Sequence, residues 1–230
     1  MELKKAVAVV TGANRGFGRH LAAQLVERGA KVYGAARRPE TVDVPGVIPL
    51  RLDVTDEASV REGARLASDA TLLINNAGIS TGTTLMGGDV SEVRREMETN
   101  FFGPLAATRA FAPVIEGNGG GAVLNVLSAL SWFHPAGLGS YAASKAAAWA
   151  LSDATREELA PRGITVSALH VGYMDTDMAA GVPADQKVAV ADVAAQALDG
   201  IETGLPEILA DETSRYVKQS LFAAPQPNAD

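Results

Sequence analysis

Residues 6–18 read AVAVVTGANRGFG, in which an apolar run passes through a glycine-rich turn into a helical pattern. After the turn, Phe17, Leu21 and Leu25 recur every four residues, and Gly29 stands where a helix C-terminal cap belongs. The stretch therefore predicts a buried strand, a tight turn and a helix in immediate succession. Such a unit opens many α/β folds.

The same alternation continues along the chain. Two long helices are expected, one from Asp89 to Phe111 with Glu92 as a capping-box partner, and one from Ser140 to Leu159. Helices between strands imply right-handed βαβ crossovers and a parallel sheet covered on both faces. Runs rich in Val, Ile and Leu, typical of buried strands, occupy residues 6–10, 31–35, 47–52, 71–74, 122–127 and 164–169.

These patterns predict a single-domain α/β protein, a Rossmann-type doubly wound parallel sheet flanked by helices on both faces. The domain is expected to span residues 1–222. Residues 223–230, which include two prolines, are expected to form a flexible tail.

The composition limits the class of protein. Of the 230 residues, 47% are hydrophobic and 20% are charged, which is ordinary for a soluble globular protein. The absence of Cys excludes disulfides and thiolate metal sites, and the three His residues lack metal-ligand spacing, so we expect no metal. The net charge of −7 argues against a nucleic-acid surface. No apolar run approaches the length of about 18 residues that a membrane helix needs. We expect a cytoplasmic protein with no nucleic-acid or membrane partner.

The glycine-rich turn has a functional interpretation. Glycines permit a tight turn and let the backbone approach a pyrophosphate, whose negative charge is favourable at a helix N-terminus. A glycine-rich turn without any ligand is the alternative, but the strand–turn–helix context favours a dinucleotide. The residues expected to bind it are Gly12, Asn14, Arg15, Gly16, Phe17 and Gly18.

The end of the second expected strand indicates which dinucleotide binds. An enzyme that prefers NAD usually has an acidic residue there for the ribose hydroxyls, whereas this chain has Ala36 followed by Arg37 and Arg38. Together with Arg15, these guanidinium groups suit a 2′-phosphate, so the sequence predicts NADP(H). The alternative is that these arginines form a solvated basic loop that binds no phosphate. Of the three, Arg38 is the one most expected to point to water.

A second group of residues points to proton transfer. Tyr141 and Lys145 are four apart in a helical segment and share one face. An adjacent ammonium favours phenolate, so we expect Lys145 to lower the pKa of Tyr141. Ser128, at the end of the fifth strand, could hydrogen-bond a substrate carbonyl oxygen, with Ser131 as a rival for this role. The alternative is a half-buried aromatic residue beside a solvated charge.

The order and spacing of these motifs resemble the short-chain dehydrogenase/reductase family over almost the whole chain. The motifs are T-G-x-x-x-G-x-G from Thr11, L-D-V-T from Leu52, N-N-A-G from Asn75 and Y-A-A-S-K from Tyr141. The resemblance implies a catalytic tetrad of Asn100, Ser128, Tyr141 and Lys145. It favours Ser128 over Ser131, because the family serine lies thirteen residues before the tyrosine, and it implies that Asn100 holds a water leading from Lys145 to solvent.

The same resemblance implies further cofactor contacts. Asp53 would bind the adenine amino group with Val54 beside the ring, although a strand-end acid, or Thr55, could instead cap the next helix. Val171 stands where the family has proline, which leaves the local turn less rigid. The remaining implied contacts, including the two tetrad residues that also meet the cofactor, are Asn76, Ala77, Gly78, Tyr141, Lys145, Gly172, Met174 and Thr176.

The implied activity is NADPH-dependent reduction of a ketone or aldehyde to an alcohol, reversible, with Tyr141 as general acid/base. The alternative is a non-catalytic NADP(H)-binding regulatory or scaffold protein of the same fold. A substrate lid is expected at about residues 173–186, and Trp132 and Phe133 either line the pocket or pack against a neighbouring segment. The resemblance also implies a homodimer or homotetramer built on the two long helices.

Overall fold

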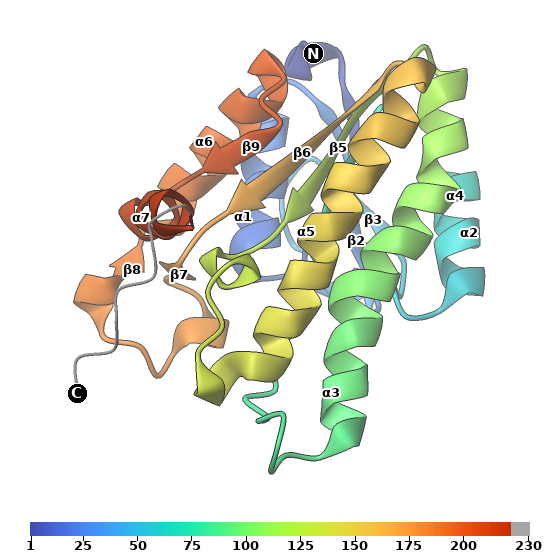
Figure 1. Cartoon of the computed structure of the whole chain (residues 1–230). Coiled ribbons are helices and arrows are strands. Elements are labelled where there is room, and N and C mark those ends of the chain that lie inside the picture. Colours follow the sequence, from blue (N-terminus) through green and yellow to red (C-terminus); the bar gives the residue numbers. More distant parts are fainter. Residues whose placement is uncertain (222–230) are drawn as a thin grey trace, which may run out of the picture.

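The computed structural model describes residues 1–221, so the expected tail at 223–230 lies outside the described residues. A seven-stranded parallel sheet forms the centre of the molecule in the order β3-β2-β1-β4-β5-β6-β9, as Figure 1 shows in part. The predicted Rossmann-type sheet is thus confirmed. Its strands are β1 (Val7–Thr11), β2 (Lys31–Ala36), β3 (Val47–Arg51), β4 (Leu72–Asn75), β5 (Gly121–Val126), β6 (Ile164–His170) and β9 (Glu207–Leu209).

Helices cover both faces of this sheet (Figure 1). One face carries α1 (Gly16–Glu27) and α6 (Val190–Thr203), which contact each other. The other carries α2 (Glu57–Leu66), α4 (Gly103–Gly117) and α5 (Gly139–Leu159). None of the helices in the described part of the chain could span a lipid bilayer.

Alternating strand residues feed two separate cores, as the pleat of a strand requires. Ala8 and Val10 pack with Leu21 beneath α1 and α6, whereas Val9 packs with Phe111 beneath α4. The central strands β1, β4, β5 and β6 are therefore buried on both faces, whereas the edge strand β3 is largely exposed. This double burial explains why they appear in the sequence as continuous apolar runs.

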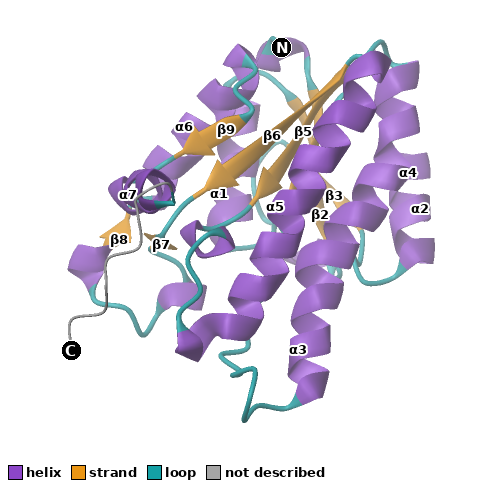
Figure 2. Cartoon of the chain, in the orientation of Figure 1, coloured by secondary structure: helices purple, strands orange, loops and turns teal. Residues whose placement is uncertain are grey.

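The strand order places the loops after β1 and β4 side by side. The chain runs from β1 outward to β3, then returns and builds β4, β5 and β6 on the other flank of β1. In open parallel sheets, the crevice at such a reversal, beyond the carboxyl ends of the strands, is where ligands bind. Figure 2 shows the loops that follow the arrowheads of β5 and β6 gathered at this end.

The helix expected from Asp89 to Phe111 is interrupted. It consists of α3 (Val90–Met97), one π-helical turn (Glu98–Phe102) and α4, which runs on to Gly117. The expected capping box is wrong: the Asp89 side chain accepts a hydrogen bond from the Ser91 N–H at 2.8 Å, while Glu92 pairs with Arg95 at 2.7 Å. Single π turns occur often at functional sites, and this one contains Asn100.

Two short strands close the segment after β6. β7 (Tyr173–Met174) pairs in parallel with β8 (Lys187–Val188), and the chain between them makes two 3-10 turns. This segment coincides with the stretch expected to form a lid. It is followed by α6, then β9, and finally α7 (Glu212–Ser220), which packs near the segment after β5.

Candidate functional site

The glycine-rich turn has the geometry of an anion cradle. Gly12 has a φ of 68°, in the left-handed region that favours glycine, and a Cβ there would lie 3.1 Å from the Cα of Ala77. A Cβ on Gly18 would collide with the carbonyl oxygen of Gly12. Helix α1 begins at Gly16 with no side-chain cap and no acidic residue in its first turn. Its first N–H groups, which no side chain caps, therefore fit the pyrophosphate of a dinucleotide.

Thr11 joins this turn to the loop after β4. Its buried hydroxyl accepts hydrogen bonds from the N–H groups of Asn76, at 2.9 Å, and Ala77, at 3.0 Å. The Asn76 side chain donates in return to the Thr11 carbonyl at 2.8 Å. The sequence analysis did not select Thr11, although its place directly after the first expected strand, at the start of the glycine motif, could have identified it.

Two of the three arginines expected near the adenosine follow β2 directly. Ala36 is buried as the last residue of β2, while Arg37 and Arg38 are exposed. Arg15 is also exposed, and its guanidinium lies 3.9 Å from the carboxylate of Asp177, which follows β7. Thus no acidic residue occupies the end of β2, and three cations surround the glycine turn and the end of β2.

Asp53 and Val54 are half-buried just after β3. Asp53 accepts hydrogen bonds from the Thr55 N–H at 3.0 Å and the Thr55 hydroxyl at 2.7 Å. Neither Asp53 nor Thr55 caps α2, because Asp56 does so by accepting hydrogen bonds from the N–H groups of Ala58 and Ser59. The alternative in which Asp53 or Thr55 caps this helix is therefore wrong.

Ser128, Tyr141 and Lys145 lie together beyond the end of β5. Ser128 follows the strand by two residues, and its hydroxyl accepts a hydrogen bond from the Leu130 N–H at 3.1 Å. Lys145 lies one turn after Tyr141 in α5, with its Nζ 5.7 Å from the centre of the phenol ring. The structure thus brings a hydroxyl, a phenol and an amine into one cluster.

The electrostatics of this cluster differ from expectation. Burial raises the pKa of Tyr141 well above its ordinary value, and the nearby Ser128 hydroxyl opposes this shift only in part. Burial also lowers the pKa of Lys145 to about 8. The expectation that the Lys145 ammonium lowers the pKa of Tyr141 is therefore wrong for this structure, because desolvation dominates both groups.

Asn100 adjoins the same cluster from the π turn. Its side-chain oxygen accepts from the Ile79 N–H, and its amide donates to the Ile79 carbonyl and the Ser144 hydroxyl, each at 2.9 Å. A Cβ placed on Gly78 would lie 3.2 Å from the Asn100 oxygen and 3.6 Å from Lys145 Nζ. Asn100 and Lys145 therefore flank the same small space. Ser144 was missed by the sequence reasoning, although its place between Tyr141 and Lys145 was a signal.

Ser131 supports the backbone of Ser128. Its hydroxyl accepts from the Ser128 N–H at 3.4 Å, and it is buried. The carbonyl of Ser128 in turn lies 3.2 Å from Nδ1 of His170, a fully buried residue whose pKa burial lowers to about 3. His170 stacks on Trp132 with ring centres 3.7 Å apart. Trp132 therefore packs inside the molecule, whereas Phe133 is exposed.

The segment after β6 is held by its neighbours, although Val171 replaces proline. Val171 is buried, and its carbonyl accepts from the Ala129 N–H at 3.0 Å. The Gly172 N–H donates to the buried Asp211 carboxylate at 2.7 Å, a contact that the sequence analysis did not anticipate. Thr176 lies against the glycine turn, with Cγ2 3.5 Å from where a Cβ would stand on Gly16.

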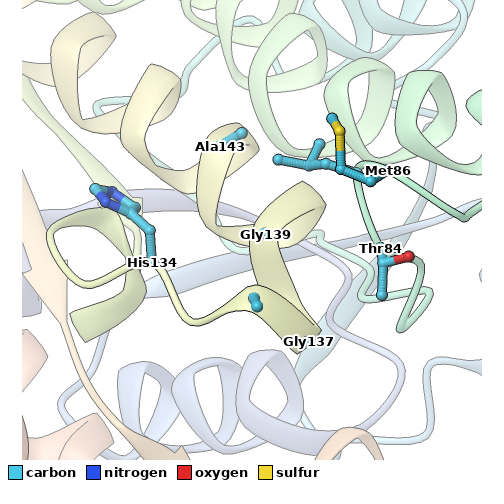
Figure 3. A pocket seen from close by; sticks show the side chains of 8 residues that line it. Thr84, Met86, His134, Gly137, Gly139 and Ala143 are labelled. Atoms are coloured by element: carbon cyan, nitrogen blue, oxygen red, sulfur yellow. The ribbon is translucent and has the colours of Figure 1, made fainter.

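A pocket of about 670 Å³ opens beside the first turn of α5 (Figure 3). Ala143 is exposed on this side, and it is two residues, or about 200° around the helix, from Tyr141. The pocket therefore lies on the outer side of α5 rather than at the phenol. It is lined by Thr84, Leu85, Met86, His134, Ala136, Gly137, Gly139 and Ala143.

Comparisons with known proteins agree with this geometry. A crystal structure of a short chain dehydrogenase from Burkholderia cenocepacia J2315, in complex with NADP, is 40% identical with a TM-score of 0.93, covering 97% of this chain and 95% of that one. The 3-oxoacyl-(acyl-carrier-protein) reductase FabG of Salmonella typhimurium is 33% identical over 96% of each chain. The NADPH-dependent 1-acyldihydroxyacetone phosphate reductase of Schizosaccharomyces pombe is 35% identical over 76% of this chain and 62% of that protein.

The family model described as short chain dehydrogenase matches residues 6–187. This range contains the glycine turn, the loop after β4, the π turn and the Ser128–Tyr141–Lys145 cluster. The chain therefore belongs to the short-chain dehydrogenase family of oxidoreductases.

Proposed function

We propose that this protein catalyses the reversible, NADPH-dependent reduction of a ketone or aldehyde to an alcohol. The observation that carries the proposal is the cluster of Ser128, Tyr141 and Lys145 at the carboxyl ends of the strands, next to a glycine turn that fits a pyrophosphate. Two of the similar proteins are named as reductases, and the name of one of them specifies NADPH.

Tyr141 is the proton donor in this proposal. Because burial raises its pKa, the phenol holds its proton at neutral pH and can deliver it to the oxygen of a carbonyl as that oxygen gains charge. Ser128 hydrogen-bonds the same oxygen and orients it towards Tyr141. Lys145 and Asn100 complete the set. The amine of Lys145, when protonated, supplies a positive charge near the phenol. Asn100 borders the space through which a new proton can reach Tyr141.

The cofactor site is built from the two joined loops and the end of β2. Arg15, Arg37 and Arg38 bind the 2′-phosphate, while Asp53 and Val54 contact the adenine. When bound, NADPH supplies the hydride that reaches the carbonyl carbon. The residues proposed to hold its pyrophosphate, ribose and nicotinamide portions are Gly12, Asn14, Gly16, Phe17, Gly18, Asn76, Ala77, Gly78, Tyr141, Lys145, Gly172, Met174 and Thr176.

Residues 173–186 form the substrate lid in this proposal, because they leave the scaffold immediately after the Val171–Gly172 turn and return at β8. We further propose a cytoplasmic homodimer or homotetramer. The lack of Cys in the sequence fits a reducing compartment. The outward face of α5 carries small side chains, including the exposed Ala143 and Ala150, which permit close helix packing.

The test is consumption of NADPH by the purified protein with a panel of aliphatic, aromatic and acyl ketones and aldehydes. We expect at least one carbonyl compound to be reduced, with NADPH preferred to NADH. If NADPH binds, by fluorescence titration, but no compound on the panel is turned over, the non-catalytic binding protein replaces this proposal.

A further inference from the structure

Glu96 is a fully buried carboxylate near the end of α3. Within residues 1–221, no Lys, Arg or His nitrogen lies within 4.0 Å of it. Burying an unpaired carboxylate costs several kcal/mol unless hydrogen bonds stabilise it. An apolar residue would fill this place at lower cost, so the bonds that Glu96 makes require an explanation.

Those bonds join two segments that flank Tyr141. One carboxylate oxygen of Glu96 accepts from the N–H of Thr81, at 2.6 Å, and from the Thr81 hydroxyl, at 2.9 Å. The other oxygen accepts a short hydrogen bond from the hydroxyl of Ser140. Thr81 belongs to the loop after β4, and Ser140 lies in the first turn of α5, directly before Tyr141.

The arrangement repeats the one made by Asn100, one helical turn later. Asn100 also binds the loop after β4, at Ile79, and also binds α5, at Ser144. Residues four apart in a helix share a face. Glu96 and Asn100 therefore form two neighbouring hydrogen-bonded bridges between the loop after β4 and α5. The phenol-bearing residue stands between the two α5 attachments.

We propose that Glu96 is a positioning residue for the reaction, which fixes the loop after β4 and the first turn of α5 relative to one another around Tyr141. This inference rests on the proposed carbonyl reduction. Thr81, which Glu96 binds, lies three residues before Thr84, and Thr84 begins the stretch that lines the pocket beside α5. Glu96 therefore also sets where that stretch begins. Loss of the carboxylate leaves the part-buried N–H and hydroxyl of Thr81 and the buried hydroxyl of Ser140 without their acceptor.

The charge of Glu96 provides a readout that a purely structural role would not give. The charged or titratable groups that act on or adjoin Tyr141 are Glu96 from α3, Tyr173 from β7 and Lys145 from α5 itself. The negative charge of Glu96 raises the pKa of Tyr141. Without this charge, the phenolate form of Tyr141 is less strongly disfavoured. The pKa of Tyr141 therefore falls.

Two substitutions separate the bonds from the charge. Glu96→Ala removes both, whereas Glu96→Gln keeps an oxygen for Thr81 and an amide for Ser140 but has no charge. We expect Glu96→Ala to raise the KM for a ketone roughly tenfold and to speed hydrogen exchange of the Thr81 amide. The KM for NADPH should change less, because Thr11 still holds Asn76 and Ala77. We expect Glu96→Gln to restore most of the KM and most of the exchange protection.

Both substitutions should move the basic limb of the pH profile of kcat/KM to lower pH. Ser140→Ala keeps the charge of Glu96, so it should raise the KM for the ketone without moving this limb. The matched control is Glu92→Gln, which makes the same chemical change on the surface of α3, where Glu92 pairs with Arg95. It should change none of these quantities.

Unchanged Thr81 exchange and an unchanged ketone KM in Glu96→Ala would overturn the inference. So would an unmoved basic limb in Glu96→Gln. If Glu96→Ala does not fold, the Gln and Ser140→Ala variants decide the question. If the wild type reduces no carbonyl compound, the proposed function fails, and Thr81 exchange alone decides whether Glu96 fixes the loop.

Discussion

The Nζ of Lys145 donates a 2.9 Å hydrogen bond to the carbonyl oxygen of Val126, the last residue of β5. The amine is thereby attached to the end of a central strand while its own helix carries Tyr141. Because the group is buried, its pKa falls to about 8, from an ordinary value of 10.5. This shift has a measurable effect on the pH dependence of stability.

Lys145 should make the protein more stable as pH rises from about 8 to 10. In this range the unfolded chain still holds the proton that the folded protein has released, so the free energy of unfolding increases with pH. The gain relative to Lys145→Met is at most roughly 3 kcal/mol by pH 10.5. Tyr141 acts in the opposite direction only above its unfolded pKa of 10, and it is common to both proteins.

The measurement is urea unfolding at several pH values for the wild type and for Lys145→Met. The exposed Lys4 offers a control, because Lys4→Met should show no such window. Parallel stability curves for wild type and Lys145→Met between pH 8 and 10 would mean that the buried amine does not titrate there.

Tyr141→Phe should keep the fold and the affinity for NADPH but lose turnover. Only the phenolic proton is removed, and a positioned proton donor contributes roughly 10²- to 10⁴-fold in rate. Steady-state kcat with the best ketone is the quantity to measure. Tyr216→Phe, on an exposed residue of α7, is the control and should have wild-type kcat. Near-normal turnover by Tyr141→Phe would end the proposed role of the phenol.

The double substitution Ala36→Asp with Arg37→Ser should reverse the preference for the cofactor. The new carboxylate repels a 2′-phosphate and accepts hydrogen bonds from ribose hydroxyls, and one guanidinium contact is lost. The ratio of kcat/KM for NADPH over NADH should fall roughly 10- to 100-fold. Arg61→Ser, on the exposed side of α2, is the control. A wild type that already prefers NADH would refute the NADP(H) assignment.

Ala150→Glu should dissociate the proposed oligomer. Ala142 is buried against its own subunit, but Ala150 is exposed on the outward face of α5. A carboxylate there would be desolvated or repelled in a close helix contact. Light scattering at micromolar concentration should give an oligomer for the wild type and a smaller species for the variant. Ala58→Glu, on exposed α2, should keep the wild-type mass, and a monomeric wild type would contradict the proposal.

Much of the fold could be predicted because the central strands are buried on both faces and even the exposed edge strand β3 is rich in apolar residues. Each of the six expected strands overlaps a strand of the sheet, with ends displaced by a residue or two. The seventh, β9, has only three residues, and β7 and β8 have two each, so none is long enough to show a periodic pattern. Their pairing depends on tertiary contacts that no local pattern encodes.

The site was less completely predictable. The four-residue spacing of Tyr141 and Lys145 places them on one helix face, and the structure has this arrangement. Glu96 gave no such signal, since it follows Arg94 and Arg95 in a stretch typical of a solvated helix face. Only the neighbouring loop and α5 bury it. The pKa of Tyr141 also could not be judged from spacing, because desolvation depends on everything packed around the phenol.

The parallel pairing of β7 with β8 means that the chain leaves the scaffold at Met174 and rejoins it at Lys187, whatever lies between. Lengthening a flexible connection costs little, about 0.6 kcal/mol for each doubling. Residues 177–186, which follow the proposed cofactor contact Thr176, can therefore be exchanged as a cassette of variable length while the sheet and the Tyr141 cluster stay in place. Under the proposal that residues 173–186 form the substrate lid, a scaffold of this kind can acquire new substrates by insertion and deletion in one segment, and protein engineers can graft loops there.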